Sequence, residues 1–264
     1  MKTDLIYSLY QRAFPFIKFL KTGFLLFCVP GIFYSQSLDE SALPGLPDDT
    51  AKINLLLELG EKYCSIENDK ALAYLQEAFS LATASNYEQG TGRSLLWQGR
   101  VYYYKDDYKL AEKYYGLAEN SIKKCDDKES MVLLSFFMGE SSRIQGDYQN
   151  ALNHYKNVLE WSKMAPNNII SSTSYMAIGN ILVARNDPVK ALGYFREALK
   201  RKEEIGDSFG IACALVQFGE AYEMLGQQDS SLYYYTKSLE IREQLGISRV
   251  IASSKYSLGG ILIS

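Results

Sequence analysis

The chain has 264 residues, of which 47% are apolar and 13% aromatic, and this composition excludes an intrinsically disordered protein. Its 28 basic and 31 acidic residues give a formal net charge of −3, which argues against a nucleic-acid binder because such proteins carry a basic stripe. The single histidine, His154, excludes a histidine-rich metal site, and we expect no metal or other cofactor. The four cysteines, at 28, 64, 125 and 213, form no C-x-x-C pair.

Residues 1–36 are typical of a secretory signal peptide. They carry four basic side chains against one acidic one, followed by an apolar run at 23–34 and by small or polar residues at 35–37. As a helix the apolar run rises about 18 Å, too short for a hydrocarbon core of about 30 Å. We therefore predict export to a periplasmic or other extracytoplasmic space, with cleavage near residues 35–37. An uncleaved signal anchor over residues 14–34 is the alternative, and it would leave the protein membrane-anchored.

Residues 37–50 are predicted to be a flexible linker. This stretch, SLDESALPGLPDDT, contains two prolines, one glycine and four acids. Such residues favour turns over regular structure, and the final Asp and Thr are suited to cap a helix that begins near residue 51.

From residue 51 onward the sequence repeats with a forty-residue period. Glycines recur at one phase of this period, and we call them the anchor glycines: Gly60, Gly99, Gly139, Gly179, Gly219 and Gly259. Each of the first five is followed by a turn and by an Ala/Ser-x3-aromatic-x2-small pattern, as in Ala111-Tyr115-Ala118, with Leu75 in the aromatic position of the first repeat. Apolar residues recur at spacings of three and four in both halves of a repeat. The pattern predicts ten helices and a partial eleventh, with Asp107, Asp147 and Asp187 as helix caps.

The anchor glycines indicate where the two helices of a repeat touch. A glycine inside a helix costs about 1 kcal/mol relative to alanine, so a glycine kept at one phase needs a packing reason. We expect the first helix of each pair to approach the second there, with the small residue of the second helix opposite and an aromatic ring filling the remaining space. This arrangement also accounts for many of the 21 tyrosines.

The repeat resembles the tetratricopeptide repeat (TPR) family. LLWQGRVY at 95–102 and the Ala151-x3-Tyr155 pattern match the family pattern W-x2-L-G-x2-Y…A-x3-F, whereas a forty-residue period alone would also fit HEAT or armadillo repeats. The resemblance covers residues 51–264, as five repeats and the first helix of a sixth. The repeat departs from the family pattern in its period, in its missing closing proline, and in the tryptophan position, which holds Leu56, Leu95, Ser135, Tyr175 and Leu215. The resemblance implies an all-α, right-handed superhelical solenoid of helix-turn-helix repeats.

A narrower resemblance concerns the segments at 205–212 and 238–246. They are similar to the TPR arrays of exported bacterial sensor proteins, in which a signal peptide and a TPR array precede a transmembrane helix and a histidine kinase, cyclase, phosphatase or helix-turn-helix output. This resemblance implies a sensory region of a larger signalling protein.

By the TPR resemblance, the first helix of each repeat lines a concave groove. Residues three before, one after and four after an anchor glycine are expected to face it, and the candidate peptide-groove residues are Leu96, Arg100, Tyr103, Phe136, Arg143, Met176 and Asn180. The apolar stripe with alternating charge favours an extended or helical peptide with apolar anchors, and it excludes the lysine clamp that chaperone-binding TPRs use for a terminal carboxylate. Arg100 and Asn180 are expected to be exposed. The alternative is that the stripe only packs helix against helix.

No nucleotide-binding, metalloprotease or α/β-hydrolase motif is present, so we expect no enzyme in this chain. The leading interpretation is a non-enzymatic protein- or peptide-binding TPR module that is exported and serves as the sensory or scaffolding part of a larger signal-transduction protein. The alternatives are a stand-alone adaptor that assembles envelope proteins, or the N-terminal part of a histidine kinase or cyclase whose output domain is absent. We expect no nucleic-acid partner, and membrane contact only through the N-terminal segment or a missing C-terminal part.

The last residues form only half of a repeat. Residues 253–264 keep the anchor phase through Gly259 but lack a second helix, and they present an apolar rather than a polar end. We therefore predict a fragment of a longer array. The alternative is a true stop whose end is covered by dimerisation or by a partner.

Overall fold

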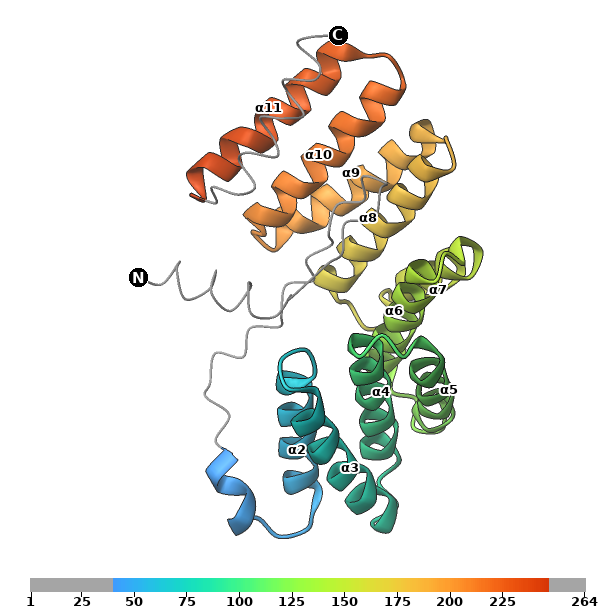
Figure 1. Cartoon of the computed structure of the whole chain (residues 1–264), viewed down its shortest axis with the longest axis vertical. Helices are drawn as coiled ribbons and strands as arrows, with labels where there is room; N and C mark the ends of the chain where they lie inside the picture. The colour runs from blue at the N-terminus through green and yellow to red at the C-terminus, as the bar shows by residue number, and fades with distance from the viewer. Residues whose placement is uncertain (1–39, 247–264) are drawn as a thin grey trace. The chain divides into compact units, whose positions relative to one another are not determined.

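The structure, a computed structural model, describes residues 40–246 and contains only helices over that range (Figure 1). The signal peptide predicted at 1–36 and the half repeat at 253–264 lie outside the described residues. None of the described helices combines the length and the apolar character needed to cross a membrane. The elements are η1 (Glu40–Gly45), α2 (Thr50–Tyr63), α3 (Asn68–Ala84), α4 (Glu88–Tyr104), α5 (Tyr108–Lys124), α6 (Lys128–Ile144), α7 (Tyr148–Trp161), α8 (Asn168–Ala184), α9 (Pro188–Glu204), α10 (Ser208–Met224) and α11 (Gln228–Gln244).

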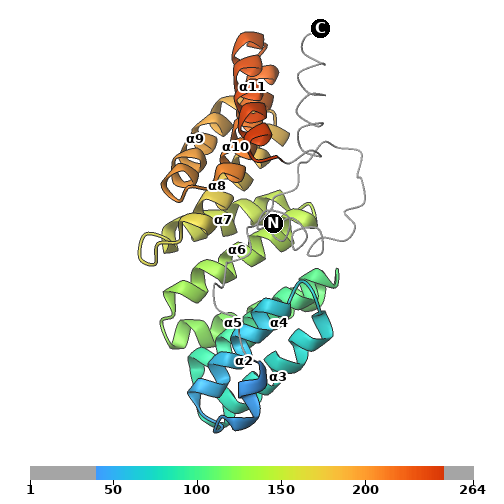
Figure 2. The same cartoon turned by 90° about the vertical axis from the view of Figure 1, so that its left-hand side faces the viewer.

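The chain divides into two compact units, Met1–Asp147 and Tyr148–Ser264. In the described part of the first unit, α4 packs against α2, α3, α5 and α6 (Figures 1 and 2). In the second unit, α8 packs against α7, α9 and α10, and α10 packs against α11. Each unit is therefore a succession of helical hairpins, which confirms the predicted all-α fold of helix-turn-helix repeats.

Four anchor glycines, Gly60, Gly99, Gly179 and Gly219, lie where the predicted helix contacts occur. A Cβ atom added at Gly99 would lie 2.6 Å from the Tyr115 ring, and one added at Gly179 would lie 2.3 Å from Cε1 of Phe195. The two rings are completely buried. Carbon atoms pack at about 3.5–4.0 Å, so neither position has room for a side chain. The packing reason inferred for these glycines is confirmed, and Gly60 against Leu75 and Gly219 against Tyr235 repeat it.

A common turn gives the repeat its even spacing. Every described α-helix except α2 and α7 spans 17 residues. The turns after α3, α4, α5 and α8 are equally short, and their middle residue has a positive φ: 54° at Asn86, 59° at Asp106, 56° at Asp126 and 61° at Asn186. Asn and Asp are the non-glycine residues that tolerate this left-handed conformation best. The turn therefore ends one helix and reverses the chain within three residues.

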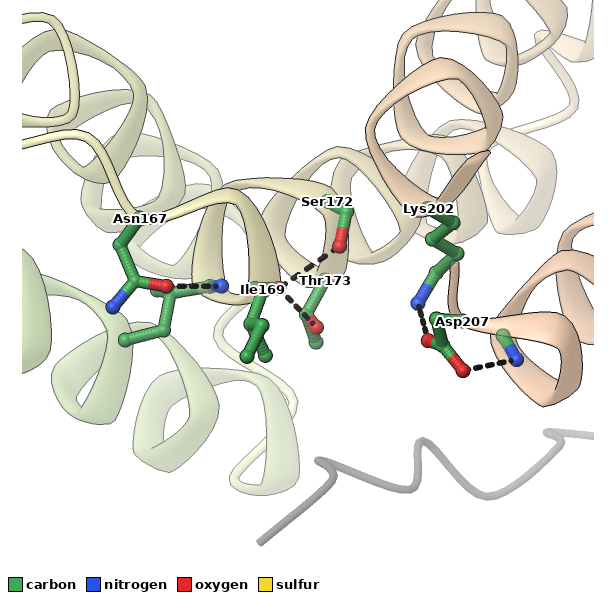
Figure 3. Close-up of polar contacts among 8 residues, drawn as sticks. Asn167, Ile169, Ser172, Thr173, Lys202 and Asp207 are labelled. Carbon is green, nitrogen blue, oxygen red and sulfur yellow. Dashed lines mark hydrogen bonds and ion pairs between the residues drawn. The ribbon is translucent and has the colours of Figure 1, made fainter. Parts of the chain in front are cut away.

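Side-chain caps begin the helices that follow these turns. The carboxylate of Asp107 accepts a hydrogen bond from the backbone N–H of Leu110 at 3.0 Å, and Asp187 accepts one from Lys190 at 3.3 Å. These two bonds confirm the predicted caps at Asp107 and Asp187. Asp207 caps α10 in the same way and also accepts a bond from the buried Nζ of Lys202 at 3.1 Å, which joins the end of α9 to the start of α10 (Figure 3).

Two of the polar residues that helix α8 buries form hydrogen bonds within the helix itself. The hydroxyls of Ser172 and Thr173 both donate to the backbone carbonyl of Ile169 at 2.9 Å (Figure 3). Because the hydroxyls bond within their own helix, they behave toward neighbouring helices as small, nearly apolar groups. This explains how these two polar residues lie in the interior.

The segment predicted to be a flexible linker contains an element that sequence reasoning did not predict. Glu40–Gly45 forms the short 3-10 helix η1, which contacts α2. The Glu40 carboxylate accepts hydrogen bonds from Tyr63, Lys70 and Tyr74 of the first hairpin. Long-range side-chain contacts of this kind have no signature in local sequence.

Candidate peptide-binding surface

The first unit carries five of the predicted groove residues on α4 and α6. Leu96 and Phe136 are buried, with 0% and 1% exposure, and they belong to the core of this unit. Tyr103 and Arg143 are half-buried. Burial, followed by the charge of Glu140, raises the pKa of Tyr103 to about 12, so its hydroxyl stays protonated and can donate a hydrogen bond. Peptide contact at these positions stays a prediction.

Arg100 lies inside a cage of aromatic rings. Its guanidinium carbon is 4.4 Å from the ring centroid of Tyr103 and 4.6 Å from those of Tyr104 and Phe137. Nη2 donates to the Tyr104 hydroxyl at 3.1 Å, while the buried Nη1 has no hydrogen-bond partner among the described residues. The expectation that Arg100 is exposed is wrong: the residue is 5% exposed, because flat rings cover the faces of the guanidinium.

Arg143 differs from Arg100 in having a charged partner. Its Nη2 and Nε donate to the two carboxylate oxygens of Glu140 at 2.8 and 3.3 Å, one turn earlier on α6. The two side chains are 15% and 6% exposed. Such a two-pronged pair fixes the orientation of the guanidinium. Arg143 therefore presents a positioned group, with its charge balanced by Glu140.

Two residues of the Arg100 cage escaped sequence reasoning. Tyr104 and Phe137 stand five after and two before an anchor glycine, outside the three phases that were assigned to the groove. Phe137 also contacts the Trp97 ring edge-on, at a centroid distance of 5.3 Å. The tyrosine run at 102–104 was the available signal, because three consecutive aromatic residues on one helix must point in different directions.

In the second unit, α8 carries the remaining two predicted residues. Met176 is 2% exposed and packs in the interior. Asn180 is also buried, at 5% exposure, which corrects the expectation that it is exposed. Its Oδ1 has no hydrogen-bond partner among the described residues. An amide of this kind can accept a bond from a bound peptide, and leaving it unbonded costs about 1–3 kcal/mol.

Helix α10 of the same unit places a second polar group at the equivalent position. Burial, followed by the charge of Glu223, raises the pKa of Glu220 to about 7, and a hydrogen bond from Gln217 opposes this shift. Glu223 in turn accepts a bond from the Tyr235 hydroxyl of α11 at 3.2 Å. The side chain directly after the anchor glycine is thus Arg100, Glu140, Asn180 and Glu220 in successive repeats.

The described residues also bear on metal binding and on thiol chemistry. Among residues 40–246 no group of three His, Cys, Asp or Glu side chains is placed to hold a metal ion. Burial raises the pKa of the Cys64 thiol to about 12, so this cysteine stays a neutral thiol that is a poor nucleophile. The polar groups described above donate and accept hydrogen bonds.

Comparison with known proteins agrees with an array of helical hairpins. A sequence profile described as tetratricopeptide repeat matches residues 129–204 and 190–244. The part of the chain at 129–244 therefore consists of tetratricopeptide repeats. No curated protein sequence matches the chain.

Several solved TPR structures share the fold. A signal transduction ATPase with numerous domains (STAND) that carries a TPR sensor, from Pyrococcus horikoshii, aligns with a TM-score of 0.68 and 16% identity over 77% of this chain. The apo form of RapI aligns with a TM-score of 0.65 and 14% identity over 84% of this chain. A Rap protein complexed with competence and sporulation factor aligns at 0.54 and 16% over 81%. This chain spans only 31% of the STAND chain and 63% of RapI, while it spans 71% of the complexed Rap protein.

Proposed function

We propose that this TPR protein is the non-enzymatic, peptide- or protein-binding part of an exported signal-transduction protein. The observation that carries the proposal is the series of polar side chains directly after the anchor glycines. Arg100, Glu140 and Asn180 are each about 5% exposed, and two of them have a buried polar atom without a hydrogen-bond partner among the described residues. A fold needs no polar group at these positions, since buried unbonded groups lower stability.

The ligand class follows from the chemistry of these groups. Arg100 and Tyr103 offer donors in the first unit, while Asn180 offers an acceptor and Glu220 a titrating carboxyl in the second. A peptide backbone supplies both acceptors and donors, and its side chains supply apolar anchors. The Rap protein that shares this fold is complexed with competence and sporulation factor, and the STAND protein uses its TPR array as a sensor. Both proteins support a recognition role for this chain.

Export is supported by the first 36 residues alone. Their basic region, short apolar run and small or polar residues at 35–37 are those of a secretory signal peptide. The partner of this TPR protein would then be met outside the cytoplasm. A scaffolding role without signalling is the alternative, and the identity of the captured partner distinguishes the two.

Binding is tested with the full chain, first by affinity capture from an envelope extract and then by calorimetry with the purified partner. Arg100→Gln and Asn180→Ala are expected to weaken binding, because the first removes the buried guanidinium and the second removes the buried amide. Arg196→Gln and Asn153→Ala are the matched controls, since both residues are exposed on second helices. Equal affinity for all four variants would refute recognition through the first helices.

A further inference from the structure

The first hairpin holds a carboxylate between two tyrosines and a lysine. Tyr63 ends α2, and Lys70 and Tyr74 lie in the first two turns of α3. The Tyr63 hydroxyl donates to Oε1 of Glu40, and the Tyr74 hydroxyl donates to Oε2 at 2.9 Å. Lys70 Nζ lies 3.0 Å from both oxygens. Three donors from two helices thus converge on one carboxyl group.

The lysine of this cluster is held in place by the two rings. Its Nζ lies 3.9 Å from the ring centroid of Tyr63 and 5.9 Å from that of Tyr74, and the rings are 6.2 Å apart. An ammonium group over a tyrosine ring gains a cation–π attraction in addition to its ion pair. Lys70 and Glu40 are each 34% exposed, so the pair lies in a partly sheltered position.

The position of Glu40 requires the chain to double back. Residue 40 precedes the start of α2 by ten residues, yet its carboxylate lies beside Tyr63 at the far end of that helix. A 14-residue helix rises about 21 Å, so residues 40–49 must run back along much of α2. Leu43 and Leu46 of this stretch are half-buried, and η1 contacts α2. The stretch therefore covers the first helix of the array.

We propose that Tyr63, Lys70 and Tyr74 form a carboxylate-binding site at the turn end of the first hairpin. Glu40 is its ligand in cis, and it fastens residues 40–49 as a strap over α2. The strap serves as an N-terminal cap, because the terminal helix of a repeat array needs a cover over its apolar face. It also sets the point at which the preceding segment joins the array, beside the α2–α3 turn.

The ionisation of Glu40 is consistent with this role. Hydrogen bonds from Tyr63, Lys70 and Tyr74, in that order of importance, lower the pKa of Glu40 to about 2. Lys62, with its Nζ at 5.1 Å from the centroid of the Tyr63 ring, is a further cation near the site. The carboxylate therefore stays charged at any pH well above 2, and the strap stays fastened through the neutral range, where the lysine and the tyrosines keep their protons.

The test uses the full chain in three forms: Glu40→Lys, Lys70→Glu, and the two changes combined. Amide hydrogen exchange of residues 41–49 is measured by mass spectrometry. Each single change places like charges face to face, so exchange there is expected to speed up roughly tenfold or more, the usual scale of a lost charge-assisted hydrogen bond. The combined variant restores opposite charges and is expected to recover much of the protection. Exchange in α8–α11 reports whether the chain stays folded.

Lys62→Glu is a matched control. Lys62 lies over the same Tyr63 ring as Lys70, but among the described residues no hydrogen bond joins it to Glu40. Its effect on residues 41–49 is expected to be much smaller than that of Lys70→Glu. Exchange of these residues at the rate of an unstructured peptide in the unchanged protein would overturn the proposal. So would equal exchange in the single and combined variants, since then Glu40 and Lys70 do not act as a pair.

Discussion

Replacing Gly179 by alanine tests the packing of a repeat with the smallest possible change. The new Cβ would lie 2.3 Å from Cε1, 2.6 Å from Cδ1 and 2.9 Å from Cζ of Phe195. Because carbon atoms need about 3.5–4.0 Å, the ring or the helix must retreat by about 1 Å. Phe195 is completely buried, so it has no solvent-facing direction in which to move.

Two terms of opposite sign decide the outcome. Alanine is favoured over glycine inside a helix by about 1 kcal/mol. Overpacking a closed interior costs about 1–3 kcal/mol and occasionally more. We expect the second term to win and Gly179→Ala to unfold at a temperature a few degrees lower, since 1 kcal/mol corresponds to about 2–4 °C for a protein of 150–250 residues. Gly179→Leu is expected to be far more destabilising.

Gly193 provides the matched control within the same unit. It lies in the partner helix α9, and a Cβ added there meets nothing within 4 Å. Gly193→Ala is therefore expected to raise the unfolding temperature through helix propensity alone. Thermal unfolding followed by far-UV circular dichroism measures both variants, and adding Phe195→Leu to Gly179→Ala should reduce the loss. A Gly179→Ala protein as stable as Gly193→Ala would refute the inferred contact.

Three further predictions concern charge, recognition and export. Folding raises the pKa of Glu220 to about 7, so ionisation of this carboxyl opposes folding, and stability should decline as the pH rises from about 4.5 to 7. Glu220→Gln should abolish this decline, and a variant whose unfolding temperature keeps the same dependence on pH would contradict the prediction. Arg100→Ala should weaken peptide binding and also lower stability, because Arg100 is buried among three rings; unchanged unfolding would show that the cage contributes nothing. Residues 1–50 fused to a reporter that is active only outside the cytoplasm should give activity, and N-terminal sequencing should place cleavage near residues 35–37; an inactive fusion would exclude export.

The fold followed from the sequence because its determinants recur. One glycine pressed against a ring is ambiguous, but Gly99 with Tyr115 and Gly179 with Phe195 repeat the same pair at the same phase of the repeat. A local pattern of this kind reports a local contact, since the two helices of a hairpin follow one another directly in the chain. Sequence reasoning therefore predicted the hairpins, their packing points and the caps at Asp107 and Asp187.

The candidate site was harder to predict because exposure depends on several helices at once. Arg100 and Asn180 were expected to face solvent on the basis of their phase within one helix, yet both are buried. For Arg100 the covering rings include Phe137, which lies on another helix and in another repeat. The contact of Glu40 with Lys70, far along the chain, likewise depends on how a proline-containing segment folds back. Neither the burial of Arg100 nor the contact of Glu40 follows from the repeat period of the sequence.

The uniform short turn has a consequence for how the array can change its length. From α8 onward a positive φ recurs at residues 186, 206, 226 and 246, so both kinds of turn there, within a repeat and between repeats, end a helix in the same way. The chain can therefore be cut and rejoined at either kind of turn with matching ends. Removal or duplication of one whole repeat conserves the alternation of anchor-glycine and aromatic helices, whereas a change of half a repeat sets two helices of the same kind against each other. Lengths that differ by whole repeats are thus the ones that recombination could accept.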